Sequence, residues 1–257
     1  QPMTLTDAGE VFLRKGNELL LSYQEMLDEI SFCTQKEQLR IRVAIPVTET
    51  PPYLPELLTR FAKEYPDMDV RIVKVEPKEA AKRSSDYDLY FSTLPLGNDL
   101  ENVIIKEDEY AVVLSSVLAS RIYGDHWQEI DEQLRLYGDL YALRDLPFIF
   151  LTNRIDETVL DQQIIFSDAG FTPEVAFQSE NSELNCNMCK LGAGAYVTTM
   201  EYCNRFFGDS LNKNDGMLLY PIRTSIDPVA IALSHRKGMR LNRADRCFIE
   251  TARDFLN

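Results

Sequence analysis

The sequence predicts an α/β protein preceded by one long helix. Strand-like and helix-like segments alternate after residue 38, whereas residues 1–37 carry only a helical pattern. The 257 residues are 45% hydrophobic and 26% charged, as in a folded chain, and no apolar run reaches the roughly 18 residues of a membrane span. This length allows one large domain or two lobes of about 100 residues each.

The first expected element is a helix over roughly residues 7–36. No proline interrupts it, and Asp7 with Glu10 fits an N-terminal capping box. Apolar residues recur at alternating spacings of four and three, as in a coiled coil. A second copy of the helix is the simplest cover for this stripe, and packing on its own domain is the alternative. The predicted dimerisation residues are Phe12, Leu19, Tyr23, Met26 and Ile30.

The segments after residue 38 predict a parallel, mostly buried sheet. Alternating apolar residues indicate a strand over 41–45, and the prolines of 46–55 mark the start of a helix that Pro66 ends. Strands separated by helices are typical of parallel sheets. Further strands are expected at 70–75, 89–92 and 111–114.

The second half repeats the alternation. A charged helical insertion is expected over 121–143. A short apolar strand over 148–151 leads into a helix from about 156 to 169, which Gly170 ends as a left-handed cap. The remaining expected elements are strands at 175–177, 195–198 and 229–233, a helix over 182–191, and a closing helix capped by Asn242.

Charge and cysteine content exclude several classes of function. The 27 Lys and Arg against 41 Asp and Glu give a net charge of −14, which argues against a phosphate-binding surface on this chain. Five cysteines are odd in number and sparse for a secreted scaffold, so reduced thiols and a cytoplasmic location are expected. Two histidines exclude a multi-His metal site, and no metal or cofactor is expected.

Two short motifs predict no activity of their own. Cys186 and Cys189 lack the second CxxC pair or the histidines of a zinc site, so buried thiols are expected, with a peroxide-sensing pair as the alternative. Residues 192–194 (GAG) follow a helix rather than a strand, so they do not predict a dinucleotide site. Because neither histidine has an evident nucleophile beside it, no enzymatic activity is expected.

Several short motifs occur in one order along nearly the whole chain. They are LTDAGEVFL at 5–13, LPELLTRF at 54–61, YPD at 65–67, PFIFL at 147–151, AGFTP at 169–173, KLGAGAYV at 190–197, RKG at 236–238 and FIE at 248–250. Together they resemble the linker helix and regulatory domain of LysR-type transcriptional regulators. Three departures affect the expected pocket wall: a longer turn at 46–52, a longer connection at 121–143, and Thr198-Thr199-Met200 in place of Leu-Leu-Pro.

The resemblance implies a two-lobe regulatory domain, like a type II periplasmic binding protein, with a small-molecule effector in the cleft. By this analogy residues 1–37 form the end of the wing and the linker helix, 38–116 with 225–257 form lobe I, and 117–224 form lobe II. It also implies a homodimer or tetramer, and a DNA-binding winged helix-turn-helix upstream of Gln1. A solute-binding protein of a transporter, which shares the two-lobe architecture, is the alternative function.

The candidate effector site consists of polar residues at strand-to-helix junctions. Ligands of open α/β sheets collect beyond the carboxyl ends of strands, where helix N-termini favour anionic or oxygen-rich groups. Arg154 is the candidate partner of a carboxylate or phosphate, while neighbouring glutamates leave an amine or polyol open. Helix capping is the alternative explanation for the hydroxyls. The candidates are Thr48, Glu49, Thr50, Ser92, Thr152, Asn153, Arg154, Asn181, Ser182 and Thr198.

Overall fold

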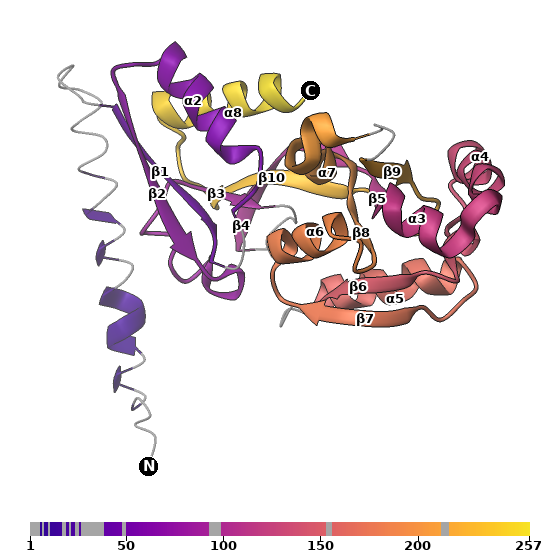
Figure 1. Cartoon of the computed structure of the whole chain (residues 1–257). Coiled ribbons are helices and arrows are strands. Elements are labelled where there is room, and N and C mark those ends of the chain that lie inside the picture. The colour runs from indigo at the N-terminus through magenta and orange to yellow at the C-terminus, as the bar shows by residue number, and fades with distance from the viewer. Residues whose placement is uncertain are drawn as a thin grey trace.

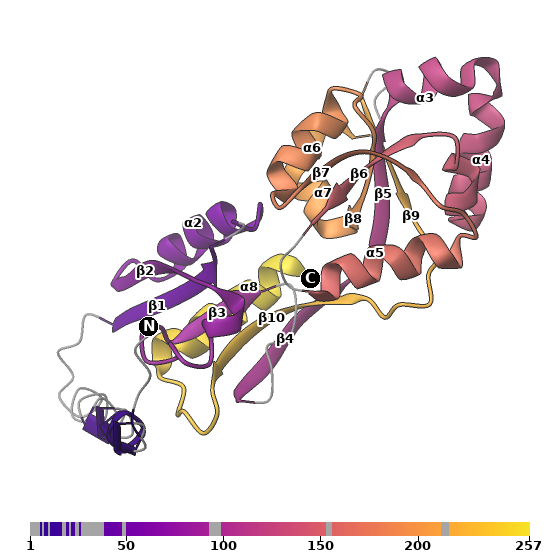
Figure 2. The same cartoon turned by 90° about the horizontal axis from the view of Figure 1, so that it is seen from below.

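Two five-stranded sheets with helices packed on them form the body of the molecule (Figures 1 and 2). This computed structural model describes residues 39–47, 50–92, 99–152, 156–211 and 216–257, together with positions 6, 8–9, 11–16, 19–20, 22–23 and 26. Within these ranges, no helix combines the length and the apolar character that crossing a membrane requires.

The first sheet has the strand order β2-β1-β3-β10-β4. Its strands are β1 (Leu39–Pro46), β2 (Met68–Val75), β3 (Leu89–Ser92), β4 (Leu100–Asp108) and β10 (Val229–Arg236). The first three strands are parallel, whereas β10 runs antiparallel to both β3 and β4. Helices α2 (Leu54–Glu64) and α8 (Arg243–Leu256) lie side by side on this sheet, with Phe61 of α2 against Phe248 of α8.

The second sheet has the strand order β7-β6-β8-β5-β9. Its strands are β5 (Tyr110–Ser115), β6 (Pro147–Leu151), β7 (Glu174–Ser179), β8 (Ala195–Thr199) and β9 (Met217–Pro221). Strands β6, β7 and β8 are parallel, and β5 is antiparallel to both of its neighbours. Its helices are α3 (Ser116–Tyr123), α4 (Trp127–Tyr137), α5 (Asp156–Asp168), α6 (Ser182–Lys190) and α7 (Met200–Phe207). Short 3-10 helices cover Pro77–Glu79, Gly124–His126, Leu140–Leu143 and Gly208–Ser210.

Each cluster of buried apolar side chains belongs to one sheet. Leu57 and Phe248 lie in a cluster of the first sheet, whereas Phe148 and Tyr196 lie in clusters of the second. Among the residues described, no such cluster has members from both sheets. The position of one sheet relative to the other therefore depends on the connecting strands and on polar contacts.

Most of the expected elements are confirmed, with three differences. Gly170 ends α5 with a φ of 75°, and Asn242 caps α8 in a complete capping box. The expected all-parallel pairing is wrong for β5 and β10, because the chain crosses between the sheets at both strands. Strand β4 was not expected, and β5 belongs to the second sheet although it was assigned to lobe I. We therefore propose a lobe boundary near residue 109 rather than after residue 116.

The described part of the expected front helix is helical and lies away from both sheets (Figures 1 and 2). Phe12 and Leu19 are 80% and 71% exposed, and Tyr23 and Met26 are also exposed. Ile30 lies outside the described residues. Pairing of this helix with a second copy stays a prediction.

Candidate functional site

The carboxyl ends of the parallel strands in the two sheets meet where the chain crosses between them. Strand β4 runs in the same direction as β1 to β3, and it ends at Asp108. One residue later β5 begins at Tyr110, which pairs with Thr199 at the carboxyl end of β8. The chain therefore passes from the carboxyl edge of the first sheet to that of the second through Glu109.

Hydrogen bonds bring several polar residues together at the carboxyl edge of the second sheet. The backbone N–H of Thr152, after β6, donates to the carbonyl of Ser179 at the end of β7 over 2.8 Å. The Ser179 hydroxyl donates to Asn185 Oδ1 at 2.7 Å and accepts from the Asn181 N–H at 3.2 Å. Asn181 in turn caps α6, because its Oδ1 accepts from the Leu184 N–H at 2.8 Å.

The other described candidates occupy comparable positions on both sheets. Thr198 is half-buried near the end of β8, and Ser92 is buried at the end of β3. Ser182 is buried as the first residue of α6, and Thr50 is exposed before α2. Neither of these two is an N-cap, since Asn181 and Tyr53 hold those positions. The candidates Thr48, Glu49, Asn153 and Arg154 lie outside the described residues.

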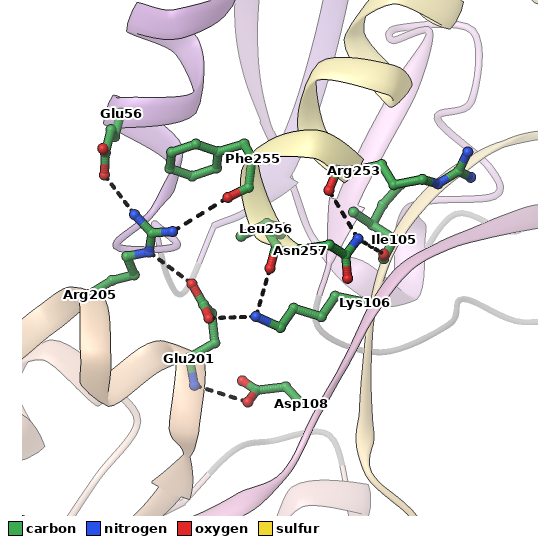
Figure 3. A network of polar contacts seen from close by, with 10 residues as sticks. All are labelled: Glu56, Ile105, Lys106, Asp108, Glu201, Arg205, Arg253, Phe255, Leu256 and Asn257. Atoms are coloured by element: carbon green, nitrogen blue, oxygen red, sulfur yellow. Dashed lines mark hydrogen bonds and ion pairs between the residues drawn. The ribbon is translucent and has the colours of Figure 1, made fainter.

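A charged network that the sequence analysis missed lies beside this crossing (Figure 3). Asp108 is buried and accepts a hydrogen bond from the backbone N–H of Glu201 at 2.9 Å. Burial raises the pKa of Asp108, although hydrogen bonds from Thr199 and Glu201 oppose the rise. Burial also acts to raise the pKa of Glu201, but hydrogen bonds from Lys106 and Arg205 outweigh it and lower that pKa. Glu201 is therefore held as a carboxylate.

A groove of about 390 Å³ lies against α2 and α8, away from the predicted junctions. None of its lining residues is a predicted effector contact. They are Glu56, Thr59, Arg60, Lys63, Glu64 and Phe255. Its lining includes two acidic and two basic side chains, so its charge selects no ligand class.

Cys186 and Cys189 are buried, as expected, and so is Cys203 on α7. The Cys189 thiol donates to the carbonyl of Val113 at 3.2 Å. Burial raises the pKa of both Cys189 and Cys203, which makes them poor nucleophiles. In the part of the chain that the structure describes, no group of three or more His, Cys, Asp and Glu residues is placed to hold a metal ion.

Comparisons with known proteins agree on one family. The family model of the LysR substrate binding domain matches residues 34–257. The uncharacterized HTH-type transcriptional regulator YcgK of Bacillus subtilis is 25% identical over 206 residues, which are 75% of this chain and 62% of the relative. The chain thus spans less than two thirds of the length of this relative.

Solved structures share the fold. The structure of HinK, a LysR family transcriptional regulator from Pseudomonas aeruginosa, is similar with a TM-score of 0.62 at 23% identity, over 99% of this chain and 83% of that one. The BenM effector binding domain with its effector benzoate is similar with a TM-score of 0.61 at 15% identity, over 84% and 90%. The fold is the two-lobe fold of type II periplasmic binding proteins. With the family model matched from residue 34 to the last residue, the chain belongs to the family of LysR substrate binding domains.

Proposed function

We propose that this chain is the effector-sensing domain of a LysR-type DNA-binding transcriptional regulator. The observation that carries the proposal is the meeting of two polar carboxyl edges at Glu109, within a chain of this family. Short hydroxyl and amide side chains such as Thr152 and Asn181 give directional hydrogen bonds at low desolvation cost. Such groups suit the binding of a small molecule better than catalysis. The BenM domain with benzoate supports a small carboxylate as a first ligand to test.

The regulatory step requires a ligand that distinguishes two arrangements of the lobes, because a ligand with equal affinity for both shifts nothing. DNA would be read by a winged helix-turn-helix outside these 257 residues, in the cytoplasm. The exposed apolar stripe that begins at Phe12 would pair with a second copy of the chain. Lobe movement would then reach the DNA-binding heads through the dimer or a tetramer.

Ligand titration followed by thermal unfolding tests the proposal. We would titrate benzoate and panels of small carboxylates, amines and polyols. A ligand at 100 times its Kd should stabilise the chain by about 2.7 kcal/mol. That raises the melting temperature by roughly 5–11 °C. Saturable stabilisation without chemical conversion of the compound is the expected result. Absence of stabilisation by every compound at millimolar concentration, or turnover of one, contradicts the proposal.

Matched threonine variants locate the ligand. Thr152→Val and Thr198→Val remove one hydroxyl each at the carboxyl edge of the second sheet and should weaken binding by about fivefold, the cost of one lost hydrogen bond. Thr59→Val is the control, because the Thr59 hydroxyl donates to the Pro55 carbonyl within α2, on the first sheet rather than the second. Equal affinity in all three variants would place the ligand elsewhere.

A solute-binding protein of a transporter is the second candidate function, since it uses the same two-lobe architecture. The sequence of the gene upstream of Gln1 distinguishes the two. A winged-helix segment favours the regulator, whereas an export signal favours transport.

A further inference from the structure

Four charged side chains link α7 on the second sheet to two elements of the first sheet (Figure 3). Glu201 lies at the centre. Its Oε1 accepts from Arg205 Nε at 2.8 Å, and its Oε2 accepts from Lys106 Nζ at 2.7 Å. Arg205 also donates through Nη1 to Glu56 Oε2 at 2.8 Å. Because Lys106 is on β4 and Glu56 on α2, the network crosses from one lobe to the other.

The end of α8 completes the network from the side of the first sheet. Lys106 Nζ donates to the carbonyl of Leu256 at 2.7 Å, and Arg205 Nη2 donates to that of Phe255 at 3.5 Å. The Arg205 guanidinium also lies over the Phe255 ring, 4.4 Å from its centroid. The last carbonyls of a helix have no partner within the helix and carry a partial negative charge. Both cations are therefore favoured at this position.

The centre of the network is shielded from water, and its outer end is not. The Glu201 side chain is 10% exposed and that of Lys106 26%, whereas that of Glu56 is 65% exposed. Charge-assisted hydrogen bonds at a shielded carboxylate are stronger than exposed ion pairs. Loss of the Glu201 charge would also leave two partly buried cations without their shared carboxylate.

We infer that Glu201, Lys106, Arg205 and Glu56 form a latch that holds the two lobes in the arrangement seen here. No cluster of buried apolar side chains in the described part of the chain joins the two sheets, so apolar packing does not fix their relative position. The chain crosses between the sheets at residues 108–110 and 221–229, and a rotation of one lobe against the other would turn about these two crossings. Among the described residues, the ion pairs of Glu201 with Lys106 and of Arg205 with Glu56 are placed to oppose such a rotation.

The position of the latch on α7 also indicates how it opens. The N-terminus of α7 is held at the crossing, where the Glu201 N–H donates to Asp108 and the Met200 N–H donates to the Glu109 carbonyl at 2.9 Å. Arg205 lies four residues further along, about 6 Å from this point along the helix axis. A rotation about the crossing therefore displaces the Arg205 end more than the Glu201 backbone, so the contact with Glu56 breaks first.

The link between the latch and a ligand rests on the proposed function. A ligand that prefers another arrangement of the lobes must open the latch. A variant with a weaker latch shifts the equilibrium toward that arrangement, and the affinity for the ligand rises by the same factor as the equilibrium shifts. A ligand that prefers the arrangement seen here would show the opposite change.

The distance between two spin labels in the ligand-free chain tests the latch by itself. Lys82→Cys and Glu132→Cys place one label on an exposed residue of each lobe. Cys33 and Cys247 are first changed to Ser, and the remaining cysteines are buried. We expect one narrow distance population with the latch intact. Glu201→Gln and Arg205→Ala should shift the ratio of arrangements by about tenfold and produce a second population.

Three further variants keep the test decisive. Glu56→Gln alters an exposed partner and should produce a smaller second population, while Arg205→Lys should restore part of the original one. Arg60→Gln is the control, because it breaks an ion pair with Glu64 inside α2, at 2.9 Å, without touching the second lobe. Unchanged distances in both Arg205→Ala and Glu56→Gln overturn the inference, even if Glu201→Gln fails to fold.

Ligand titration of the same variants separates the two proposals. If the variants alter the spin-label distances but no compound binds, the latch is supported and the proposed function is rejected. If a compound binds but no variant changes the spin-label distances, the latch is rejected and the proposed function is supported.

Discussion

Gly194 directly precedes β8 and lies against the backbone of β6, so a side chain there should weaken the second lobe. A Cβ at this position would lie 3.0 Å from the Pro147 carbonyl oxygen and 3.3 Å from the carbonyl carbon of Phe148, both backbone atoms of β6. It would also lie 3.1 Å from Ile149 Cγ1. Because backbone atoms cannot turn aside as a flexible side chain does, the two strands must separate. We expect Gly194→Ala to lower the free energy of unfolding by about 2 kcal/mol.

Tryptophan fluorescence measures this change in the relevant lobe. The single tryptophan, Trp127, packs on the second sheet, so its emission follows unfolding there. For a chain of this size 2 kcal/mol corresponds to a melting temperature lower by roughly 4–8 °C. Gly16→Ala is the control, because a Cβ at Gly16 meets no atom within 4 Å and alanine favours a helix. A Gly194→Ala protein that melts at or above the wild-type temperature refutes the steric argument.

Three other experiments each examine one contact. Asn242→Ala removes the side chain that caps α8 and should lower the free energy of unfolding by about 1 kcal/mol, measured by circular dichroism in urea. Tyr220→Phe removes a hydroxyl that donates to Asp131. Burial acts to raise the pKa of Asp131, but hydrogen bonds from its partners, Tyr220 among them, lower it. The resulting stabilisation is present above the unfolded pKa of about 3.9 and disappears as the pH falls through the lowered folded value, so the Tyr220→Phe defect should shrink in acid. Since burial raises the pKa of Cys189 and Cys203, both should react with iodoacetamide about 100-fold more slowly in the folded chain than in urea, as mass spectrometry would measure.

Each of these predictions has a control in the same chain. Asn187→Ala changes an exposed residue inside α6 and should alter stability by less than about 0.5 kcal/mol. Tyr137→Phe, on an exposed tyrosine of α4, should leave the acid dependence as in the wild type. Half-buried Cys247 should react faster than the two buried thiols. The role of the Asn242 cap is contradicted if Asn242→Ala loses no more unfolding free energy than the control. A Tyr220→Phe defect that does not change with pH contradicts the role of the Tyr220–Asp131 hydrogen bond. Fast labelling of Cys189 contradicts its burial.

Elements with a strong local pattern could be predicted from the sequence. Alternating apolar residues identified β1, and the cap residue Asn242 located the start of α8. Strand β4 lacks such a pattern, because Leu100–Asp108 is an edge strand with charged and partly exposed residues along it. Strand β4 pairs with β10, which begins only at Val229. The local sequence of β4 therefore does not predict the pairing that makes it a strand.

The latch could not be predicted for the same reason. Lys106 and Glu201 are 95 residues apart, and Glu56 and Arg205 are 149 residues apart. On α7 alone, Glu201 and Arg205 are a favourable pair at spacing i,i+4, which is typical of an exposed helix face. Only the fold shows that this face contacts the other lobe.

The strand that carries one candidate ligand contact also leads directly into the latch. Thr198 lies near the end of β8, and α7 begins at Met200 without an intervening loop. The Met200 N–H donates a hydrogen bond to the Glu109 carbonyl at the crossing, so β8 and α7 are anchored at one point between the lobes. A displacement at Thr198 therefore cannot be absorbed by a flexible connection before it reaches Glu201. On the proposed function, a ligand at the polar edge and the ion pairs of α7 would therefore act on the same lobe arrangement, without a pathway of intermediate side chains.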